Sequence, residues 1–428
     1  MRQRGAVITG IGLTTPLGSS VAESWANLTG LRSGITHTPR PGVPASLQYS
    51  GKVKRLVLPD LVIPNLLAQM KFLNRGALLG FGAAFEAMSQ AGITLDSVPA
   101  HRRALFIASG DMTKVGYDSF YPAFEESTDD GWKKLDAEKL NRATLSKVNP
   151  FFLLESIANN LFSFLSTFYE LRGPNTNLAS LSPYGSQALE LGYRSIRRGR
   201  ADVALVVGYC NWITDIPSYE LEELGLLSKC QSGPSSFRPF DRMRDGFIPG
   251  EGGAAIVVEG EDLAQRRGAK TLGQVRGCGN CIDFLDGSAL GVASQVTQRS
   301  LRMALEEAGC EMKELAFVCG HGSATQKGDR SELSSIRTLM DNENVMVPVC
   351  GMKSYSGHMG AASDLAEVVW GLKAVKQGLV PATLNFEKAE TEFARLGISG
   401  RHLPTSKSFF ISSSYGMGSQ SSAVVVSV

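Results

Sequence analysis

Short runs of apolar residues alternate along this chain with stretches in which apolar residues recur every three or four positions. The apolar runs predict buried β-strands at residues 5–16, 105–108, 203–207, 254–258 and 316–318. The wider spacing predicts helices at residues 20–28, 73–90, 183–198 and 295–307, and one more between His358 and Gly378. Because strands and helices alternate, we expect an α/β fold built from layers.

The same order of elements occurs twice. A helix that ends in Ala-Gly, at residues 91–92 and again at 308–309, precedes a short strand. A loop followed by a helix that ends at a glycine also recurs, once after Ser182 and once after His358. This internal duplication predicts two similar halves that bring Ser182 and His358 to one shared site. We place the halves at residues 1–265 and 266–428.

An insertion at about residues 111–171 interrupts the first half. Mixed charges and little periodicity over residues 111–145 predict an excursion from the core. Residues 149–171 are rich in aromatic side chains. We expect most of these rings to pack in the core, with Phe162 a candidate for the wall of a pocket.

Composition excludes several kinds of protein. The chain has 428 residues, 43% of them hydrophobic, and a net charge of +2, which favours neither a nucleic acid nor a membrane partner. Seven scattered cysteines fit a reducing compartment, and the lone C-x-x-C of Cys278 and Cys281 is interpreted as structural, not as a metal site. With no signal peptide and no apolar run long enough to cross a membrane, we expect a soluble cytoplasmic protein.

Ser182 is the candidate nucleophile. A run of apolar and small residues stops at Ser182-Pro183 and a helical pattern follows, so Pro183 is expected as the first helical residue. Free backbone N–H groups and the positive end of the helix dipole at such a junction stabilise an oxyanion. A serine that only caps the helix is the alternative.

His321 and His358 are candidate bases. Each lies in a glycine-rich turn, where the backbone can approach a ligand closely and the ring can enter a cleft; a structural histidine is the alternative. Lys353 and Glu367, before and after His358, form either a pair that orients this histidine or a simple ion pair. Near the carboxyl end, residues 416–418 form a Gly-x-Gly loop that can aim backbone N–H groups at an oxyanion.

Taken together, these segments resemble the β-ketoacyl synthase family of condensing enzymes, which has the thiolase fold. The resemblance covers nearly the whole chain and implies duplicated αβαβα layers with an inserted cap region. The segments that carry it are residues 7–12, 16–18, 240–241, 244–247, 250–252, 321–325, 328–329, 353–354, 357–358, 360–362 and 414–418.

The resemblance implies roles for single residues. The family loads an acyl chain on a cysteine and uses two histidines, matched here by His321 and His358, to decarboxylate a malonyl unit. Lys353 and Glu367 match the lysine and glutamate that accompany the histidines. Ser323 and Thr325 match the residues that hold the phosphopantetheine arm. Backbone N–H groups of Ser182 and Met417 are expected to form the oxyanion hole, and the acyl pocket and its gate are expected at Tyr415, Met417 and Phe162.

The departure from the family is at the nucleophile, because counting from both sides places Ser182 at the cysteine position. A hydroxyl needs a base, and His321 or His358 is the candidate if it lies within hydrogen-bond reach. An acyl-serine ester is less electrophilic towards carbon than a thioester. We therefore expect a ketosynthase-like acyltransferase or acyl hydrolase in fatty acid or polyketide biosynthesis, working through acyl-Ser182.

Two alternatives stay open: a non-catalytic subunit that pairs with a cysteine-bearing ketosynthase, as chain-length factors do, and a decarboxylating or condensing β-ketoacyl synthase. The resemblance implies an acyl carrier protein as partner, a homodimer or heterodimer, no metal and no bound cofactor. Phosphopantetheine or coenzyme A would carry the substrate. The candidate basic residues for carrier docking are Lys71, Arg75, Arg194, Arg197, Arg198 and Arg200.

Overall fold

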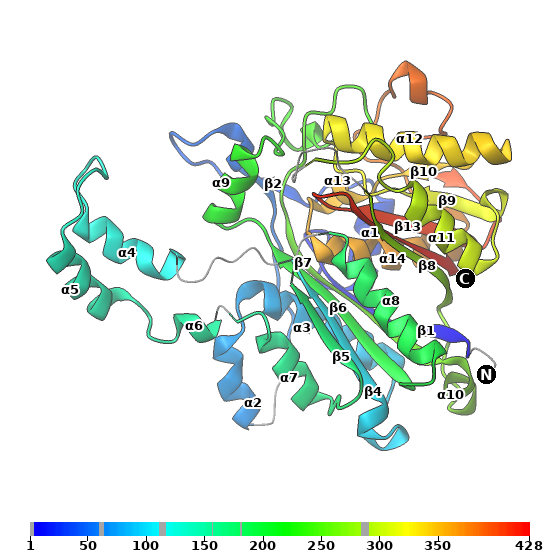
Figure 1. Ribbon diagram of the computed structural model, residues 1–428, viewed down its shortest axis with the longest axis horizontal. Coiled ribbons are helices and arrows are strands. Elements are labelled where there is room, and N and C mark those ends of the chain that lie inside the picture. The colour runs from blue at the N-terminus through cyan, green and yellow to red at the C-terminus, as the bar shows by residue number, and fades with distance from the viewer. Residues whose placement is uncertain (1–3, 60–63, 111–116, 156, 180–181, 284–290) are drawn as a thin grey trace.

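Ten strands form the central sheet of the computed structural model, which describes residues 4–59, 64–110, 117–155, 157–179, 182–283 and 291–428 (Figure 1). They run in the order β10-β9-β13-β14-β8-β1-β7-β6-β4-β5. The first set of five is β1 (Ala6–Thr14), β4 (Arg103–Ser109), β5 (Asn175–Ala179), β6 (Val203–Asn211) and β7 (Glu251–Gly260). The second set is β8 (Gly273–Ile282), β9 (Leu315–Cys319), β10 (Val349–Cys350), β13 (Phe409–Tyr415) and β14 (Gln420–Ser427).

The two sets repeat one topology. In each set the fifth strand lies antiparallel between the first and the fourth, and the second strand lies parallel between the fourth and the third. A short antiparallel pairing of β1 with β8, at Val7 with Gln274 and Ile8 with Gly273, joins the sets. The repeat seen in the sequence is therefore a repeat of structure, whereas the exact boundary at residues 265 and 266 stays a prediction.

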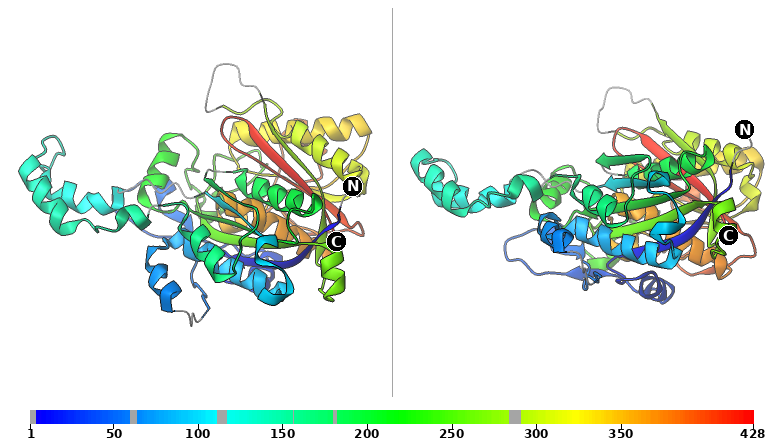
Figure 2. Two further views of the ribbon diagram at one scale, coloured as in Figure 1. Left: turned by 60° about the horizontal axis from the view of Figure 1, so that its bottom comes forward. Right: turned by 90° about the horizontal axis from the view of Figure 1, so that it is seen from below.

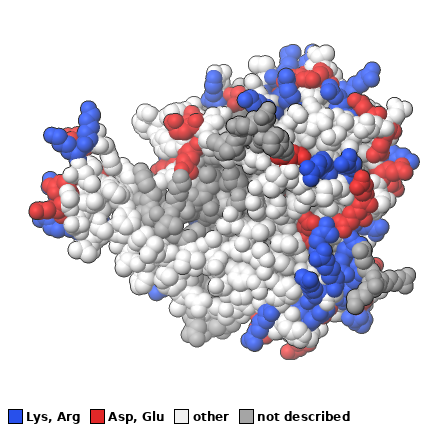
Figure 3. Space-filling view, in the orientation of Figure 1, with Lys and Arg blue, Asp and Glu red and all other residues white. Residues whose placement is uncertain are grey.

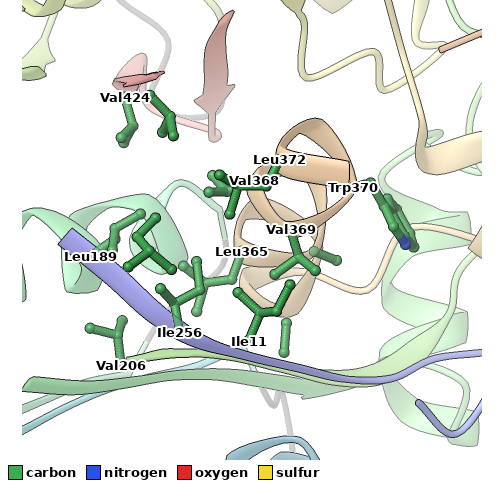
Figure 4. Packing of buried hydrophobic residues seen from close by; sticks show 14 of the residues in the cluster. Ile11, Leu189, Val206, Ile256, Leu365, Val368, Val369, Trp370, Leu372 and Val424 are labelled. Carbon is green, nitrogen blue, oxygen red and sulfur yellow. The ribbon is translucent and has the colours of Figure 1, made fainter. Parts of the chain in front are cut away.

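Two helices, α8 (Tyr184–Arg197) and α14 (Ala361–Lys376), form the layer between the sets. Helix α14 lies against β6 and β7 on one side and β13 on the other, and all of its residues from Ala361 to Leu372 are buried. A helix that is apolar on every side must be enclosed by other elements. Figure 4 shows how its side chains meet those of α8 and the strands, with labels on Ile11, Leu189, Val206, Ile256, Leu365, Val368, Leu372 and Val424.

Outer helices complete five layers in the order α/β/α/β/α. Helix α3 (Arg75–Ala91) covers β1, β6 and β7, and α11 (Gln298–Ala308) covers β8 and β14, next to α12 (Gln326–Glu343). Both α3 and α11 end at a left-handed glycine, as the Ala-Gly pairs predict. The outer helices pack so closely on the strands that only glycine fits at two contact points. A Cβ on Gly12 would lie 1.9 Å from the Ala83 carbonyl oxygen, and a Cβ on Gly279 would lie 2.0 Å from the Ser300 carbonyl oxygen.

The insertion is an arm rather than the expected cap. Helices α4 (Tyr117–Ser127), α5 (Ala137–Lys147) and α6 (Phe152–Glu155) project away from the body, and α7 (Asn160–Phe168) returns to pack on α3 (Figure 1). Figure 2 shows the arm projecting in both further views. Helices α4 and α5 pack mainly on each other, so the arm leaves apolar side chains exposed. These include Tyr121, Trp132, Leu135, Leu145, Phe151 and Leu153.

Smaller elements complete the chain. The remaining helices are α1 (Val21–Thr29), α2 (Pro64–Gln69), α9 (Asp215–Glu223), α10 (Glu261–Arg266) and α13 (Lys353–Ser356). Two small antiparallel pairs join β2 (Ile35–His37) with β3 (Tyr49–Gly51) and β11 (Leu379–Val380) with β12 (Leu403–Pro404). Cys278 and Cys281 both lie on β8, three positions apart, so they point to opposite faces of the strand. Across the described ranges, no helix is long and apolar enough to span a membrane.

Truncation of the enclosed helix tests this architecture. Leu365→Ala is expected to lower the free energy of unfolding by about 2–5 kcal/mol. It leaves a cavity between the two sets of strands, and the surrounding side chains cannot move far enough to fill it. Met346→Ala, at a side chain that is 61% exposed, is the matched control and should change stability by less than about 0.5 kcal/mol. Urea unfolding followed by circular dichroism measures both. Equal midpoints for the two variants would contradict the enclosure of α14.

Candidate active site

A small pocket of about 80 Å³ lies between the two halves. Its polar wall comes from both halves, with Ser182 at the start of α8 and both candidate histidines from loops of the second half. Such a volume is too small for a whole drug-sized ligand and suits only the reactive end of a longer one. The lining residues are Ser182, Trp212, Leu221, Leu226, Phe247, Val292, His321, Ser323, Thr325, His358, Tyr415, Gly416 and Met417.

Ser182 is buried, and its hydroxyl faces helix α14. The Oγ atom donates a hydrogen bond to Asp364 Oδ1 at 3.1 Å and lies 3.4 Å from the carbonyl oxygen of Gly360. Within the part of the chain that the structure describes, no hydrogen bond joins Ser182 to either imidazole. The expectation that a histidine accepts this proton is therefore not supported, because α14 places a carboxylate beside the hydroxyl instead.

The start of helix α8 also differs from expectation. Pro183 occupies the N-cap and makes no side-chain cap, so the helix begins at Tyr184 and Ser182 lies outside it. The cap comes from another helix: Asp364 Oδ2 accepts the N–H of Gly185 at 3.1 Å, and the N–H of Ser186 bonds the same side chain. One carboxylate thus binds both the serine hydroxyl and free N–H groups of the helix.

The two histidines meet each other. His321 Nε2 and His358 Nε2 are 3.2 Å apart, and His358 Nδ1 accepts the N–H of Gly360 at 3.1 Å. We therefore assign the proton of neutral His358 to Nε2, which donates to His321 Nε2 and leaves the proton of His321 on Nδ1. Burial, followed by the positive charge of Lys353, lowers the pKa of both imidazoles well below the ordinary value, so both rings are neutral near pH 7.

Backbone contacts from the first half hold His358. Its N–H donates to the carbonyl oxygen of Ile248 at 2.8 Å, and its own carbonyl accepts the N–H of Gly250 at 2.9 Å. The rings of Trp212 and Phe247 lie 4.8 and 5.0 Å from the imidazole, centre to centre. The position of His358 therefore depends on the packing of both halves.

Glu332 on α12 fixes the loop of His321. Its carboxylate accepts the backbone N–H groups of His321 at 2.7 Å and Gly322 at 2.9 Å, and the hydroxyl of Ser413 at 2.9 Å. A fully buried carboxylate with three donors is satisfied and holds the loop in one conformation. Sequence reasoning missed this residue, since nothing near Glu332 in the chain marks it as a loop anchor.

Lys353 and Glu367 form a buried ion pair. The Nζ atom lies 2.9 Å from each carboxylate oxygen, and both side chains are 0% exposed. Burial alone would lower the pKa of Lys353, but the charges of Glu367 and Asp364 raise it above its ordinary value. Among the described contacts, the pair makes no hydrogen bond to an imidazole. Burial lowers the pKa of both imidazoles, and Lys353 lowers it further through its positive charge.

Three hydroxyls line the pocket beside His321. Ser323 Oγ lies 2.8 Å from Thr325 Oγ1 and 3.0 Å from the Tyr415 hydroxyl, and the Tyr415 ring packs against the His321 ring at 4.4 Å between centres and 50° between planes. A Cβ on Gly416 would lie 2.1 Å from the Ser182 carbonyl oxygen, so the loop that carries Met417 passes directly behind Ser182. The structure thus brings Tyr415 and Met417 to the pocket wall, as expected.

Other expected residues lie elsewhere. Phe162 does not line this pocket; it lies on α7 and packs against the apolar cluster under α3, where the short hydrophobic spacing of that helix places it. Arg194 and Arg197 sit at the far end of α8 from Ser182 and are paired with Glu307. Arg75 is bound to the buried Glu251. These arginines are therefore committed to structural ion pairs rather than placed at the pocket.

Asp364 is the main residue that the sequence analysis missed. A signal was present, because an aspartate in the first turn of a helix that is otherwise buried on all sides needs a partner. Across the described ranges, no three metal-ligating side chains cluster.

Two family models match this chain. The model described as β-ketoacyl synthase, N-terminal domain, matches residues 3–264, and the one described as β-ketoacyl synthase, C-terminal domain, matches residues 274–387. A 3-oxoacyl-(acyl-carrier-protein) synthase 2 of Staphylococcus aureus (strain COL) is 24% identical over 425 residues, which cover 99% of this chain and 98% of the relative.

Solved structures match over the full length. One is described as a type II PKS acyl-carrier protein in complex with its ketosynthase bound to the hexaketide; its matched chain has a TM-score of 0.83 at 21% identity, with 100% and 99% of the two chains covered. The ishigamide ketosynthase/chain length factor gives a TM-score of 0.81 at 23% identity, with 100% and 99% covered. These likenesses show the thiolase-like fold that the sequence predicts.

The buried ion pair gives a test of the site's electrostatics. Lys353→Met is expected to destabilise the protein by about 3–5 kcal/mol, because it leaves Glu367 as an unpaired buried charge. The double variant Lys353→Met with Glu367→Leu removes both charges and should recover much of that loss. Urea unfolding of the three proteins measures this. A single variant as stable as the parent protein would show that the pair carries no such charge.

Proposed function

Because the chain belongs to the β-ketoacyl synthase family, we propose that it is an acyltransferase that takes acyl chains from an acyl carrier protein through an acyl-Ser182 intermediate. Fatty acid or polyketide synthesis is the proposed setting, in line with the activities named for its relatives. The observation that carries the proposal is the position of Ser182. Ser182 lines a pocket together with His321 and His358, and a carboxylate accepts the hydrogen bond of its hydroxyl.

The proposed chemistry is attack of Ser182 Oγ on the carbonyl carbon of a carrier-bound thioester. Backbone N–H groups of Ser182 and Met417 would receive the oxyanion, and the close contact of Gly416 with Ser182 supports this arrangement. The neutral histidines can assist, since His358 Nε2–H is a donor that an incoming carbonyl group can take over. Ser323 and Thr325 are proposed to hold the phosphopantetheine arm of the carrier, and coenzyme A is the alternative carrier.

Transfer is favoured over condensation by the chemistry of the intermediate. An oxygen ester is less electrophilic towards an enolate than a thioester is. It reacts more readily with water, alcohols and amines than with an enolate. The site therefore suits an acceptor with an O–H or N–H group. A pocket wall that is apolar over Trp212, Phe247 and Met417 suits an acyl chain rather than a charged donor.

A second candidate function is a non-catalytic subunit that pairs with a cysteine-bearing ketosynthase. The observation that favours it is the separation of the hydroxyl from the histidines, whose hydrogen bonds go to each other. A structure named for a ketosynthase/chain length factor shares the fold. Co-purification with a cysteine-bearing homologue, together with no adduct on Ser182, would favour this candidate.

The outer face of the first half suggests where a second ketosynthase-like chain would bind. Strand β5 is the edge of the sheet, and its residues are half-buried or exposed. Figure 3 shows that the face over β5 and α7 carries few charged side chains, while Lys, Arg, Asp and Glu gather on the opposite side. The arm projects from the same face with its apolar residues exposed. We propose that a second copy of the chain covers this face and that the arm lies against it.

Detection of the intermediate tests the proposed function. Incubation with acyl carrier proteins that carry a panel of acyl chains should add one acyl mass to the peptide that contains Ser182, as read by mass spectrometry. Ser182→Ala should abolish the adduct, and Ser300→Ala, at a buried serine on α11, should keep it. Absence of an adduct with every acyl chain would exclude acyl transfer through Ser182.

Sedimentation equilibrium tests the proposed dimer. The chain should sediment near twice its mass of 45.9 kDa. Leu135→Glu combined with Leu145→Glu should shift it towards the monomer, because both side chains are exposed on the arm and would be desolvated in the dimer. Met346→Glu, away from the arm, is the control. A parent protein that sediments as a monomer, or a double variant that stays dimeric, would contradict this interface.

A further inference from the structure

We propose that Asp364 is the general base that activates Ser182. The inference rests on the proposed function, since it concerns how acyl-Ser182 would form. Its basis is the geometry at the start of α14, where Asp364 Oδ1 accepts the Ser182 hydroxyl at 3.1 Å and Oδ2 is bound to the N-terminus of α8. Asp364 touches the reacting oxygen directly, which makes it a catalytic residue rather than a positioning one.

The first step of the argument is that the carboxylate is held in place. Asp364 is 1% exposed and belongs to a helix enclosed by both halves of the sheet. The N–H groups of Gly185 and Ser186 bind the side chain, so the oxygen that faces Ser182 keeps its direction. A base needs this fixed hydrogen-bond contact with the proton it removes.

The second step is that neither imidazole has a lone pair free for Ser182. His358 Nδ1 accepts the N–H of Gly360, and its Nε2 carries the proton that goes to His321. His321 Nε2 is occupied by that bond, and its Nδ1 carries a proton with no partner among the described residues. The serine hydroxyl therefore has one acceptor able to take a proton, which is Asp364, because the carbonyl oxygen of Gly360 is not a base.

The third step concerns charge. Burial raises the pKa of Asp364 to about 6, against the lowering effects of Lys353, the Ser182 hydroxyl and the two N–H groups. The titratable groups around it are Lys353 on α13 and Glu367 one turn further along α14, and burial raises the pKa of Glu367 to about 8. Near pH 7 the Asp364 carboxylate is ionised, and its pKa lies close to the working pH, where a general base is most effective.

The proposed step balances as follows. Ser182 Oγ forms a bond to the thioester carbonyl carbon while its proton passes to Asp364 Oδ1. The C–S bond then breaks, and the proton passes from Asp364 to the leaving sulfur, which departs as the free thiol of the carrier. The carboxylate is restored, and an ester joins the acyl group to Ser182. In the second half, the acceptor oxygen or nitrogen forms a bond to the ester carbonyl carbon while its proton passes to Asp364. The bond from that carbon to Ser182 Oγ then breaks, and the proton passes from Asp364 to Ser182 Oγ.

The test measures the rate of single-turnover acylation of Ser182 by acyl coenzyme A, read by mass spectrometry between pH 4.5 and 8. In the parent protein the rate should fall about tenfold per pH unit below about pH 6, because only the ionised carboxylate accepts the proton. Asp364→Asn keeps the shape and one acceptor oxygen but removes the base, so the rate at pH 7.5 should drop about 10²–10⁴-fold. Asp341→Asn, at an exposed carboxylate on α12, is the matched control and should retain the parent rate.

A second variant separates a chemical role from a structural one. Asp364→Ala should be inactive in buffer and partly restored by sodium formate, a small carboxylate that fits the space left by the side chain. Asp364→Asn acylating at the parent rate, or a parent rate that is flat from pH 4.5 to 8, overturns this inference and leaves acyl-Ser182 standing. A parent protein with no adduct on Ser182, from acyl coenzyme A or from any of the acyl carrier proteins, overturns the proposed function and the inference together.

Discussion

The enclosure of helix α14 is the constraint on which the site depends. Every face of this helix is buried from Ala361 to Leu372, so the two sets of strands must enclose it. The two sets have the same order of strands, so they enclose the helix in a symmetrical way. Its first turn then has a fixed place at the centre of the molecule. That turn carries Asp364 to the start of α8, and the loop before it carries His358 to the segment at Ile248 and Gly250. Packing of an apolar helix thus assembles polar groups from distant parts of the chain.

Burial also determines the protonation of these groups. The imidazoles of His321 and His358 lie in a dry setting near the ammonium group of Lys353, and both effects disfavour the charged ring. The same setting raises the pKa of Asp364 towards neutrality, while its contacts with the start of α8 favour the ionised form. Two neutral imidazoles therefore line the pocket, and one carboxylate lies behind its wall, against Ser182. In a site where a serine relies on a histidine, an imidazole lies beside the hydroxyl. Here helix α14 places the carboxylate of Asp364 beside the hydroxyl of Ser182 instead.

The sequence predicts the parts of the structure that local pattern controls. Apolar periodicity locates the strands and helices, and the recurring Ala-Gly ends at Gly92 and Gly309 reveal the repeat, because left-handed helix ends require glycine. The shared pocket of Ser182 and His358 follows from the repeat. Asp364 escapes prediction because its partner lies 182 residues away in the chain, and only packing brings them together. The prediction of Phe162 in the pocket wall was wrong, because aromatic residues recur at the same spacing in a packed core and in the wall of a pocket.

The central claim is that the Ser182 hydroxyl bonds a carboxylate while the two imidazoles bond each other. A crystal structure of the unliganded protein at a pH above 7, refined at a resolution that fixes hydrogen-bond partners, is the most direct measurement. The account predicts Ser182 Oγ within hydrogen-bond distance of Asp364 Oδ1, and the Nε2 atoms of His321 and His358 within hydrogen-bond distance of each other. Ser182 Oγ bonded to an imidazole nitrogen, with Asp364 turned away, would contradict it.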